Sequence, residues 1–270
     1  AYNGEIYNYL ELRSQLSKLD VQFTTHSDTE VILKCVENFG PYETLKRLEG
    51  MFAFVVWDKL QNQLFIARDR MGEKPMYYAF VSNTLIFSSE IKAILSTRII
   101  SNEINEAGLY EFFCRTKVAG SRTLFRDIME LNPGHYLMLN HPKDELKQHK
   151  YWDVVSQYLI NKESSITDEN AAIEIVEDTL LRSVQSRMLS DVPVGLLTSG
   201  GIDSSLVAGM LSKIGYQGLK CFCAGNNNEV IDESPFATNL IDYLNVTNKS
   251  KFDLEIVKKD IDSFIEVVEN

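Results

Sequence analysis

The sequence predicts an α/β protein in two parts, an α/β/β/α sandwich followed by the start of a doubly wound parallel α/β sheet. In the first half, apolar strand-like runs joined by short turns are flanked by helix-like runs, which is typical of antiparallel strands covered by helices. In the second half, strand-like and helix-like runs alternate, which is typical of a parallel sheet. Residues 161–167 are poor in apolar side chains, so we place a linker between about residues 152 and 167.

The first half is expected to begin with two helices. The first follows Asn8, which forms a capping box with Glu11. The second has Asp28 as its expected N-cap. It is expected to stop at Gly40, because glycine followed by proline ends a helix.

Strands follow these helices. Residues 51–57 are apolar at every position, so we expect this strand to be covered on both faces. Further strands are expected at residues 63–67, 76–81 and 85–87, each bounded by turns. Helices on both sides of such antiparallel strands give the predicted sandwich.

The second half is expected to alternate between helices and strands. A helix with one apolar face covers residues 173–188, a short buried strand covers 192–197, and a helix follows through residues 206–211. A strand at 219–224, a helix at 232–244 and a third strand near 250–254 come next. A last helix is expected through Ile256, Ile261, Phe264 and Val267. So few strands cannot close a doubly wound sheet, and we interpret the chain as a fragment.

Composition excludes several classes of protein. The net charge is −11, and nearly all of the acidic excess follows residue 150, which argues against a basic nucleic-acid-binding surface. No apolar run is long enough to span a membrane, and no signal peptide is visible. The four cysteines show neither a disulfide framework nor zinc-ligand spacing. Cys221 and Cys223 are expected to be small core residues on one strand face. We therefore expect a cytoplasmic protein.

The most informative motif is SGGIDSS at residues 199–205, between an expected strand and an expected helix. Two glycines let backbone N–H groups converge, and a helix N-terminus favours an anion. Taken alone, a glycine pair before a helix is more often a simple turn. The clustered hydroxyls and Asp203 favour a pyrophosphate cradle, although the loop lacks the Gly-Lys-Ser/Thr of a Walker A motif. It resembles the pyrophosphate-binding loop of the ATP pyrophosphatases.

A second motif is NGEIYN at residues 3–8. Taken alone, Asn-Gly between β-prone residues is the usual signal for a hairpin turn. However, this motif is followed in order by SDTEVI (27–32), GMFAF (50–54), RDRMGEKP (68–75), SSEIKA (88–93) and DVPVG (191–195), and then by the SGG of the loop. This order closely resembles the glutamine-hydrolysing asparagine synthetases over nearly the whole chain.

The resemblance implies two coupled reactions. Residues 1–155 would form a class II glutamine amidotransferase domain with the N-terminal-nucleophile type of sandwich. This domain releases ammonia from glutamine. Residues 168–270 would begin an ATP-pyrophosphatase-type synthetase domain, which adenylates aspartate with ATP and Mg²⁺ and then lets ammonia displace AMP. The resemblance leaves a homodimer open.

The resemblance also implies roles for single residues. The side chain of Asn3 and the backbone N–H of Gly4 would form the oxyanion hole, while Glu5 and Asp28 would hold the α-amino group of glutamine. The ATP site would comprise Leu197 and Ala224 beside the adenine, Asp203 on Mg²⁺, and Ser199, Gly200, Gly201, Ser204 and Ser205 around the phosphates. Where Ala224 stands, the family more often has a β-branched residue.

One departure and several alternatives qualify this interpretation. The family nucleophile is an N-terminal cysteine tens of residues before Asn3, so we expect the fragment alone to be inactive. A relative that amidates another carboxylate, or one that closes a β-lactam ring, shares the architecture; the intact glutaminase motif argues against the latter. A non-catalytic nucleotide-binding or subunit-interaction protein is a further alternative. A serine hydrolase is the weakest, because the chain has no Gly-x-Ser-x-Gly elbow.

Overall fold

The computed structural model describes residues 1–140, 146–162, 165–226 and 232–258. It divides into two compact units, which we call the first unit (Ala1–Ser165) and the second unit (Ile166–Asn270). No helix among the described residues has the length and apolar character needed to cross a membrane.

The first unit contains a five-stranded and a three-stranded antiparallel sheet. The larger sheet has the order β1 (Tyr2–Ile6), β2 (Gly50–Asp58), β3 (Gln63–Arg68), β7 (His135–Leu139) and β8 (His149–Lys150). The smaller sheet has the order β5 (Thr84–Ser88), β4 (Tyr77–Val81) and β6 (Met129–Glu130). The helices of the first unit are α1 (Tyr9–Ser17), α2 (Asp28–Phe39), α3 (Pro41–Arg47), α4 (Ile91–Ser96), α5 (Glu106–Arg115) and α6 (Val154–Asn161).

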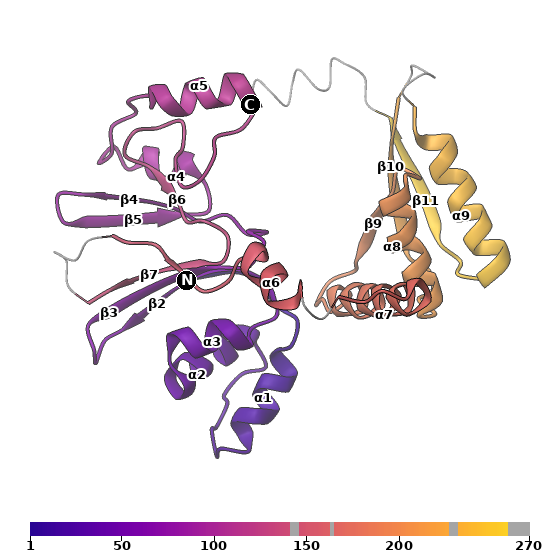
Figure 1. The fold of residues 1–270 in the computed structure, drawn as a ribbon, viewed down its shortest axis with the longest axis horizontal. Helices are drawn as coiled ribbons and strands as arrows, with labels where there is room; N and C mark the ends of the chain where they lie inside the picture. The colour runs from indigo at the N-terminus through magenta and orange to yellow at the C-terminus, as the bar shows by residue number, and fades with distance from the viewer. Residues whose placement is uncertain (141–145, 163–164, 227–231, 259–270) are drawn as a thin grey trace. The chain divides into compact units, whose positions relative to one another are not determined.

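These elements form four layers (Figure 1). Helices α1, α2 and α3 cover the outer face of the larger sheet, and α4 and α5 lie on the outer side of the smaller sheet. The two sheets face each other across a core that includes Val55, Ile66 and Leu137. The predicted α/β/β/α sandwich is confirmed.

Strand β2 lies in the middle of these layers. Phe52 and Phe54 pack in the core shared with the helices, whereas Ala53 and Val55 pack between the sheets. The prediction that this strand is covered on both faces is therefore confirmed. The C-terminal end of β2 is less covered, because Trp57 is 50% exposed.

Two predicted helix caps are wrong. Asn8 precedes α1, but its side chain does not cap the helix; it donates to the carbonyl oxygen of Arg47 and accepts from the N–H of Glu49. The N-cap of α2 is Ser27, whose hydroxyl accepts from the N–H of Thr29. A tertiary contact replaces the capping box in the first case, and a neighbouring hydroxyl is the cap in the second.

The expected linker contains a helix. Within residues 152–167, α6 starts at an N-cap, Asp153, whose side chain accepts from the N–H of Ser156 at 2.9 Å. Its apolar side chains are exposed, with Ile160 at 70%. The sequence signal for this helix was its N-cap, Asp153, which the prediction of a linker did not take into account.

The second unit is a three-stranded parallel sheet with helices. Its order is β11 (Asp253–Lys258), β10 (Lys220–Gly225) and β9 (Gly195–Leu197). The helices are α7 (Glu169–Arg187), α8 (Ile202–Lys213) and α9 (Ser234–Asn248). Helices α8 and α9 share one core with the buried residue Cys221, so they cover the same face of the sheet. Cys221 and Cys223 are 0% and 2% exposed, as predicted.

Two expectations for the strand before α8 need correction. The strand expected at residues 192–197 begins only at Gly195, because Pro193 lacks the N–H that a ladder needs. This strand is not buried, since Leu197 is 80% exposed. The apolar face of α7 is only partly covered, with Ile173 56% exposed.

Ile256 lies in β11, where it pairs with Cys223, and not in a helix. Leu254 and Ile256 alternate with polar Glu255 and therefore suit a strand. The other residues of that expected helix, Ile261, Phe264 and Val267, lie outside the described residues.

Candidate functional site

The first candidate site lies on β1, an edge strand of the larger sheet. This strand carries Asn3, Gly4 and Glu5. Gly4 has a φ of +154°, and a Cβ added there would lie 2.1 Å from the carbonyl oxygen of Met51 on β2. Only glycine fits this position, so the backbone of β1 approaches β2 here more closely than a side chain would allow.

Asp28 contacts the same strand. It is the first residue of α2, and its Oδ2 accepts from the Tyr2 hydroxyl at 2.6 Å and from the N–H of Ile6 at 3.1 Å. Burial, together with the hydrogen bond to Asp28, raises the pKa of Tyr2 well above its usual value. Both donors thus hold the Asp28 carboxylate beside β1.

Asn3 lies on the opposite face of β1 from Tyr2. Its Nδ2 donates to Oγ of Ser89 at 3.2 Å. A cavity of about 210 Å³ lies beside this contact, between the two sheets of the first unit. The lining residues are Ala1, Tyr2, Asn3, Ala53, Val55, Met76, Phe87, Ser88 and Ser89.

The loop after β3 is fixed by two buried charged residues, Arg68 and Asp69, which are 6% and 1% exposed. The Asp69 carboxylate accepts from the backbone N–H groups of Phe52, Met71, Glu73 and Lys74. Arg68 pairs with Glu130 at 2.7 Å. Phe52 lies on β2, opposite Gly4 in the β1–β2 register, so this network fixes the strand next to the β1 motif.

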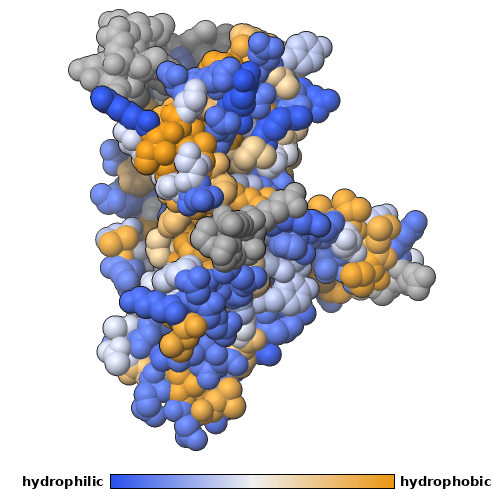
Figure 2. Space-filling view, turned by 90° about the vertical axis from the view of Figure 1, so that its left-hand side faces the viewer, coloured by the Kyte–Doolittle hydropathy of each residue, from blue (hydrophilic) through white to orange (hydrophobic). Residues whose placement is uncertain are grey.

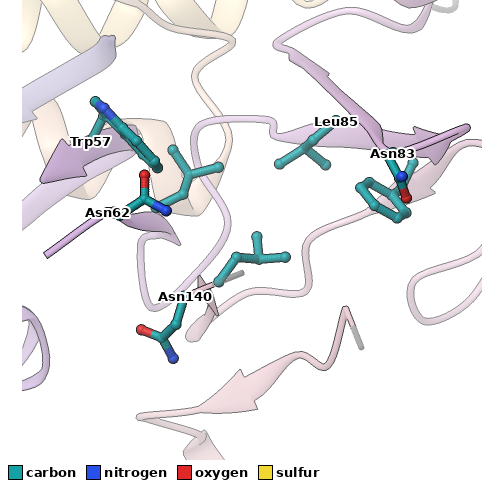
Figure 3. Close-up of a pocket in the computed structure, with 8 residues that line it drawn as sticks. Trp57, Asn62, Asn83, Leu85 and Asn140 are labelled. Atoms are coloured by element: carbon teal, nitrogen blue, oxygen red, sulfur yellow. The ribbon is translucent and has the colours of Figure 1, made fainter. Parts of the chain in front are cut away.

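A second cavity, of about 190 Å³, lies at the turn ends of the sheets. Figure 3 shows Trp57 and Asn62 on one side and Leu85 and Asn83 on the other. Asn62 and Asn83 have positive φ values of 53° and 62°, which explains both as turn residues. We assign no function to this cavity.

Figure 2 shows a mostly hydrophilic face with separate apolar patches.

The second candidate site is the loop between β9 and α8. Thr198 continues the β9 edge, where its N–H donates to the carbonyl oxygen of Phe222 at 2.9 Å. Gly200 has a φ of +75°, and a Cβ there would lie 2.4 Å from the carbonyl carbon of Phe236 on α9. Gly201 is the N-cap of α8 and provides no side-chain cap. The first N–H groups of α8 therefore have no capping side chain.

A hydroxyl cluster surrounds this helix start. Oγ of Ser204 accepts from the N–H of Ser199 at 3.3 Å and donates to the carbonyl oxygen of Gly201 at 3.2 Å. Thr198 donates to the same Oγ at 3.5 Å and accepts from the N–H of Gly200 at 3.4 Å. These bonds are long, and they join hydroxyl and N–H groups within the loop. An anion at the start of α8 can accept from the same hydroxyl and N–H groups.

The remaining predicted residues lie around this loop. Asp203 is exposed on the first turn of α8. Leu197 pairs with Phe222, and Ala224 lies two residues further along β10. Leu197 and Ala224 therefore share the sheet face opposite Cys221. Among the described residues, no three His, Cys, Asp or Glu side chains cluster as metal ligands.

The structure thus brings the predicted residues together in two groups, one in each unit. Asn3, Gly4, Glu5 and Asp28 gather around β1. The residues predicted for the ATP site gather at the start of α8 and on the neighbouring sheet face. Sequence reasoning missed Tyr2, Ser89 and Thr198 as contacts of these groups. Each stands in or beside a motif, yet the motif does not show which side chain it meets.

Comparisons with known proteins agree with this division. A family described as "Glutamine amidotransferase domain" matches residues 1–152, and one described as "Asparagine synthase" matches residues 175–269. A putative glutamine-hydrolyzing asparagine synthetase 2 of Methanocaldococcus jannaschii is 35% identical over 90% of this chain and 45% of its own length. Asparagine synthetase 1 of Bacillus subtilis, also named glutamine-hydrolyzing, is 33% identical over 93% of this chain and 38% of its own length.

A protein of Gibberella zeae named Amidase chry2 is 32% identical over 97% of this chain and 39% of its own length. The chain therefore spans less than half the length of each of these curated relatives.

Proposed function

The chain belongs to the glutamine amidotransferase domain family, and from this premise we propose that its complete gene product is a glutamine-hydrolysing asparagine synthetase. We assign residues 1–155 to the glutaminase domain and residues 168–270 to the synthetase domain. The product is expected to act in the cytoplasm, and a homodimer is compatible with this assignment.

The proposed chemistry has two parts. A thiolate attacks the side-chain amide of glutamine, ammonia leaves, and water then cleaves the thioester to glutamate. In the second part, the β-carboxylate of aspartate attacks the α-phosphorus of ATP and pyrophosphate leaves. Ammonia then attacks the acyl carbon and AMP leaves, which gives asparagine.

Asn3 and Gly4 are the proposed oxyanion donors. A tetrahedral oxyanion needs two donors aimed at one point, and an amide side chain beside a backbone N–H supplies them. The close approach of Gly4 to β2 supports this role, because it fixes the backbone next to the Asn3 side chain.

Asp28 and Glu5 are the proposed partners of the α-ammonium group of glutamine. Both hydrogen bonds to Asp28 go to Oδ2, and no described residue donates to its Oδ1. A carboxylate held in this way offers its second oxygen to a cation.

The nucleophile is proposed to lie outside the 270 residues given. Burial raises the pKa of Cys35 and of Cys221 to about 11, and burial also raises the pKa of Cys223. Buried thiols of this kind carry little thiolate at neutral pH and are poor nucleophiles. Cys114 is exposed on α5, far along the chain from the β1 motif.

The β9–α8 loop is the proposed site for ATP and Mg²⁺. The uncapped start of α8, the positive φ of Gly200 and the Ser199–Ser204 hydroxyl pair fit a phosphate chain. Asp203 fits Mg²⁺, which prefers one or two carboxylates together with phosphate oxygens and water. When bound, the ion would neutralise charge on the leaving pyrophosphate. Leu197 and Ala224 would contact the adenine from the open sheet face.

The observation that carries the proposal is the presence of both family matches in one chain, in glutaminase-then-synthetase order. The test is to supply the purified complete gene product with glutamine, aspartate and Mg-ATP. We expect asparagine, AMP and pyrophosphate in equal amounts. ADP and phosphate as products, or glutamate without asparagine, would overturn the proposal.

A second candidate keeps the chemistry and changes the acceptor. The similarity to a protein named Amidase chry2 over 97% of this chain favours it. Replacing aspartate in the same assay with a panel of other carboxylates decides between the two acceptors. AMP release that needs a different carboxylate would favour this candidate.

A further inference from the structure

We propose that Ser89 is a positioning residue for the Asn3 amide. Its hydroxyl accepts one of the two N–H bonds of Nδ2, which leaves the other directed at the developing oxyanion. This inference rests on the proposed glutaminase function.

The contact joins the two sheets. Asn3 pairs with Ala53 in the β1–β2 register, and Ala53 packs in the core between the sheets, so this side of β1 faces the smaller sheet. Ser89 directly follows β5, an edge strand of the smaller sheet. The 3.2 Å bond from Nδ2 to Oγ therefore runs from one edge strand to the end of another, beside the 210 Å³ cavity.

The Asn3 side chain needs such a partner. It is exposed, and the bond to Ser89 is the one hydrogen bond that the described residues give it. Rotation about χ2 exchanges the amide oxygen and nitrogen, and an oxygen aimed at an oxyanion would repel it. In the observed orientation Nδ2 donates one N–H to Oγ of Ser89, so its second N–H is left for the oxyanion.

Neighbouring hydroxyls do not share this role. Oγ of Ser88 accepts from the N–H of Glu90 at 3.2 Å and so fixes the local turn. Ser96, at the end of α4, donates to the carbonyl oxygen of Ala93 at 2.8 Å within its own helix. Ser96 is therefore a matched control for removing a hydroxyl in this region.

The test is a double-mutant cycle in the complete gene product. Asn3→Ala should lower the kcat for glutamine hydrolysis by roughly 10²–10³. Ser89→Ala should lower the same kcat by about 5- to 20-fold, in keeping with one lost hydrogen bond, and leave KM nearly unchanged. In the Asn3→Ala background, Ser89→Ala should have no further effect. Ser96→Ala should leave glutamine hydrolysis unchanged.

Two further measurements separate positioning from folding. Asparagine synthesis driven by free ammonia should continue at the wild-type rate in every variant, because it does not use Asn3. Ser89→Thr, which keeps the hydroxyl, should retain most of the glutaminase activity. A Ser89→Thr variant as impaired as Ser89→Ala would show that the hydroxyl is not the cause and would overturn the inference.

The outcomes also separate this inference from the proposed function. Near-normal glutamine hydrolysis by Asn3→Ala would remove Asn3 from the oxyanion hole and defeat both claims. Loss of activity in Asn3→Ala, with Ser89→Ala either harmless or fully additive, would overturn the role of Ser89 alone.

Discussion

Asp28 shows how a tertiary contact can replace the local role that a sequence predicts. Its position at the start of α2 predicts a cap, yet Ser27 is the cap and the Asp28 carboxylate turns to β1. There Tyr2 and Ile6 hold it with two hydrogen bonds. These bonds join the start of α2 to β1, and the role of Asp28 in binding glutamine is part of the proposed function.

The first prediction concerns Asp28→Asn. The amide keeps the shape but loses the negative charge that is proposed to bind the α-ammonium group of glutamine. A charge-assisted hydrogen bond is worth about 1.5–3 kcal/mol, so KM for glutamine should rise about 10- to 100-fold. Steady-state glutaminase kinetics measure this effect.

Glu37→Gln is the control, because Glu37 is an exposed partner of Lys34 on the same helix. An unchanged KM in Asp28→Asn would remove this residue from the glutamine site.

At the element scale, the loop before α2 depends on Glu30. Its carboxylate accepts from the side-chain hydroxyls and the backbone N–H groups of both Thr24 and Thr25. These bonds, led by the Thr25 hydroxyl, lower the pKa of Glu30 to about 2. The loop carries Ser27 and leads into Asp28, so Glu30 helps to place the start of α2.

The second prediction follows from this pKa. A lowered pKa means that the folded state binds fewer protons than the unfolded state, so the stabilisation is present above the unfolded pKa of about 4.3. It is lost as the pH falls toward 2. Glu30→Gln should therefore lower Tm at pH 6, and the difference from wild type should shrink as the pH falls to 3. A difference in Tm that stays constant with pH would contradict this account.

The third prediction concerns the β9–α8 loop. Gly200→Ala places a Cβ 2.4 Å from Phe236 and 2.6 Å from Ala237, at a φ of +75°. The loop and α9 must separate, so we expect a loss of more than about 2 kcal/mol in unfolding free energy. ATP-dependent pyrophosphate release should disappear. Denaturant unfolding and a pyrophosphate assay measure the two effects.

Gly209→Ala is the matched control on α8. A Cβ there meets nothing within 4 Å, and alanine favours a helix over glycine by about 0.5–1 kcal/mol. This variant should be more stable than wild type and remain active. Equal losses in both variants would mean that close packing of Gly200 is not the cause.

The sequence predicted elements well where a pattern is local. Residues 51–57 are uninterrupted and apolar, and β2 indeed lies between two packed layers. Prediction from the sequence failed where a residue distant in the chain decides the structure. Asn8 bonds to residues about forty positions away, at Arg47 and Glu49. Asn3 and Ser89 are 86 positions apart, and only the packing of one sheet on the other brings them together.

At the scale of the whole molecule, the two candidate sites belong to different compact units. The residues proposed for glutamine hydrolysis lie in the first unit, and those proposed for ATP binding lie in the second. If each unit carries one of the two proposed reactions, a change in one site should leave the reaction of the other measurable.

The fourth prediction tests this separation with Asp203→Asn. The change removes the carboxylate proposed for Mg²⁺ and leaves the first unit intact. Mg-ATP-dependent pyrophosphate release should be abolished, while glutamine hydrolysis should remain measurable. Unchanged pyrophosphate release would remove Asp203 from the metal site.

The most direct measurement follows the amide nitrogen. The complete gene product is incubated with glutamine labelled with ¹⁵N in its side-chain amide, together with aspartate and Mg-ATP, and the products are analysed by mass spectrometry. We predict ¹⁵N in the side-chain amide of asparagine, with one AMP formed for each asparagine. Hydrolysis of labelled glutamine with no label in asparagine would contradict the proposed function.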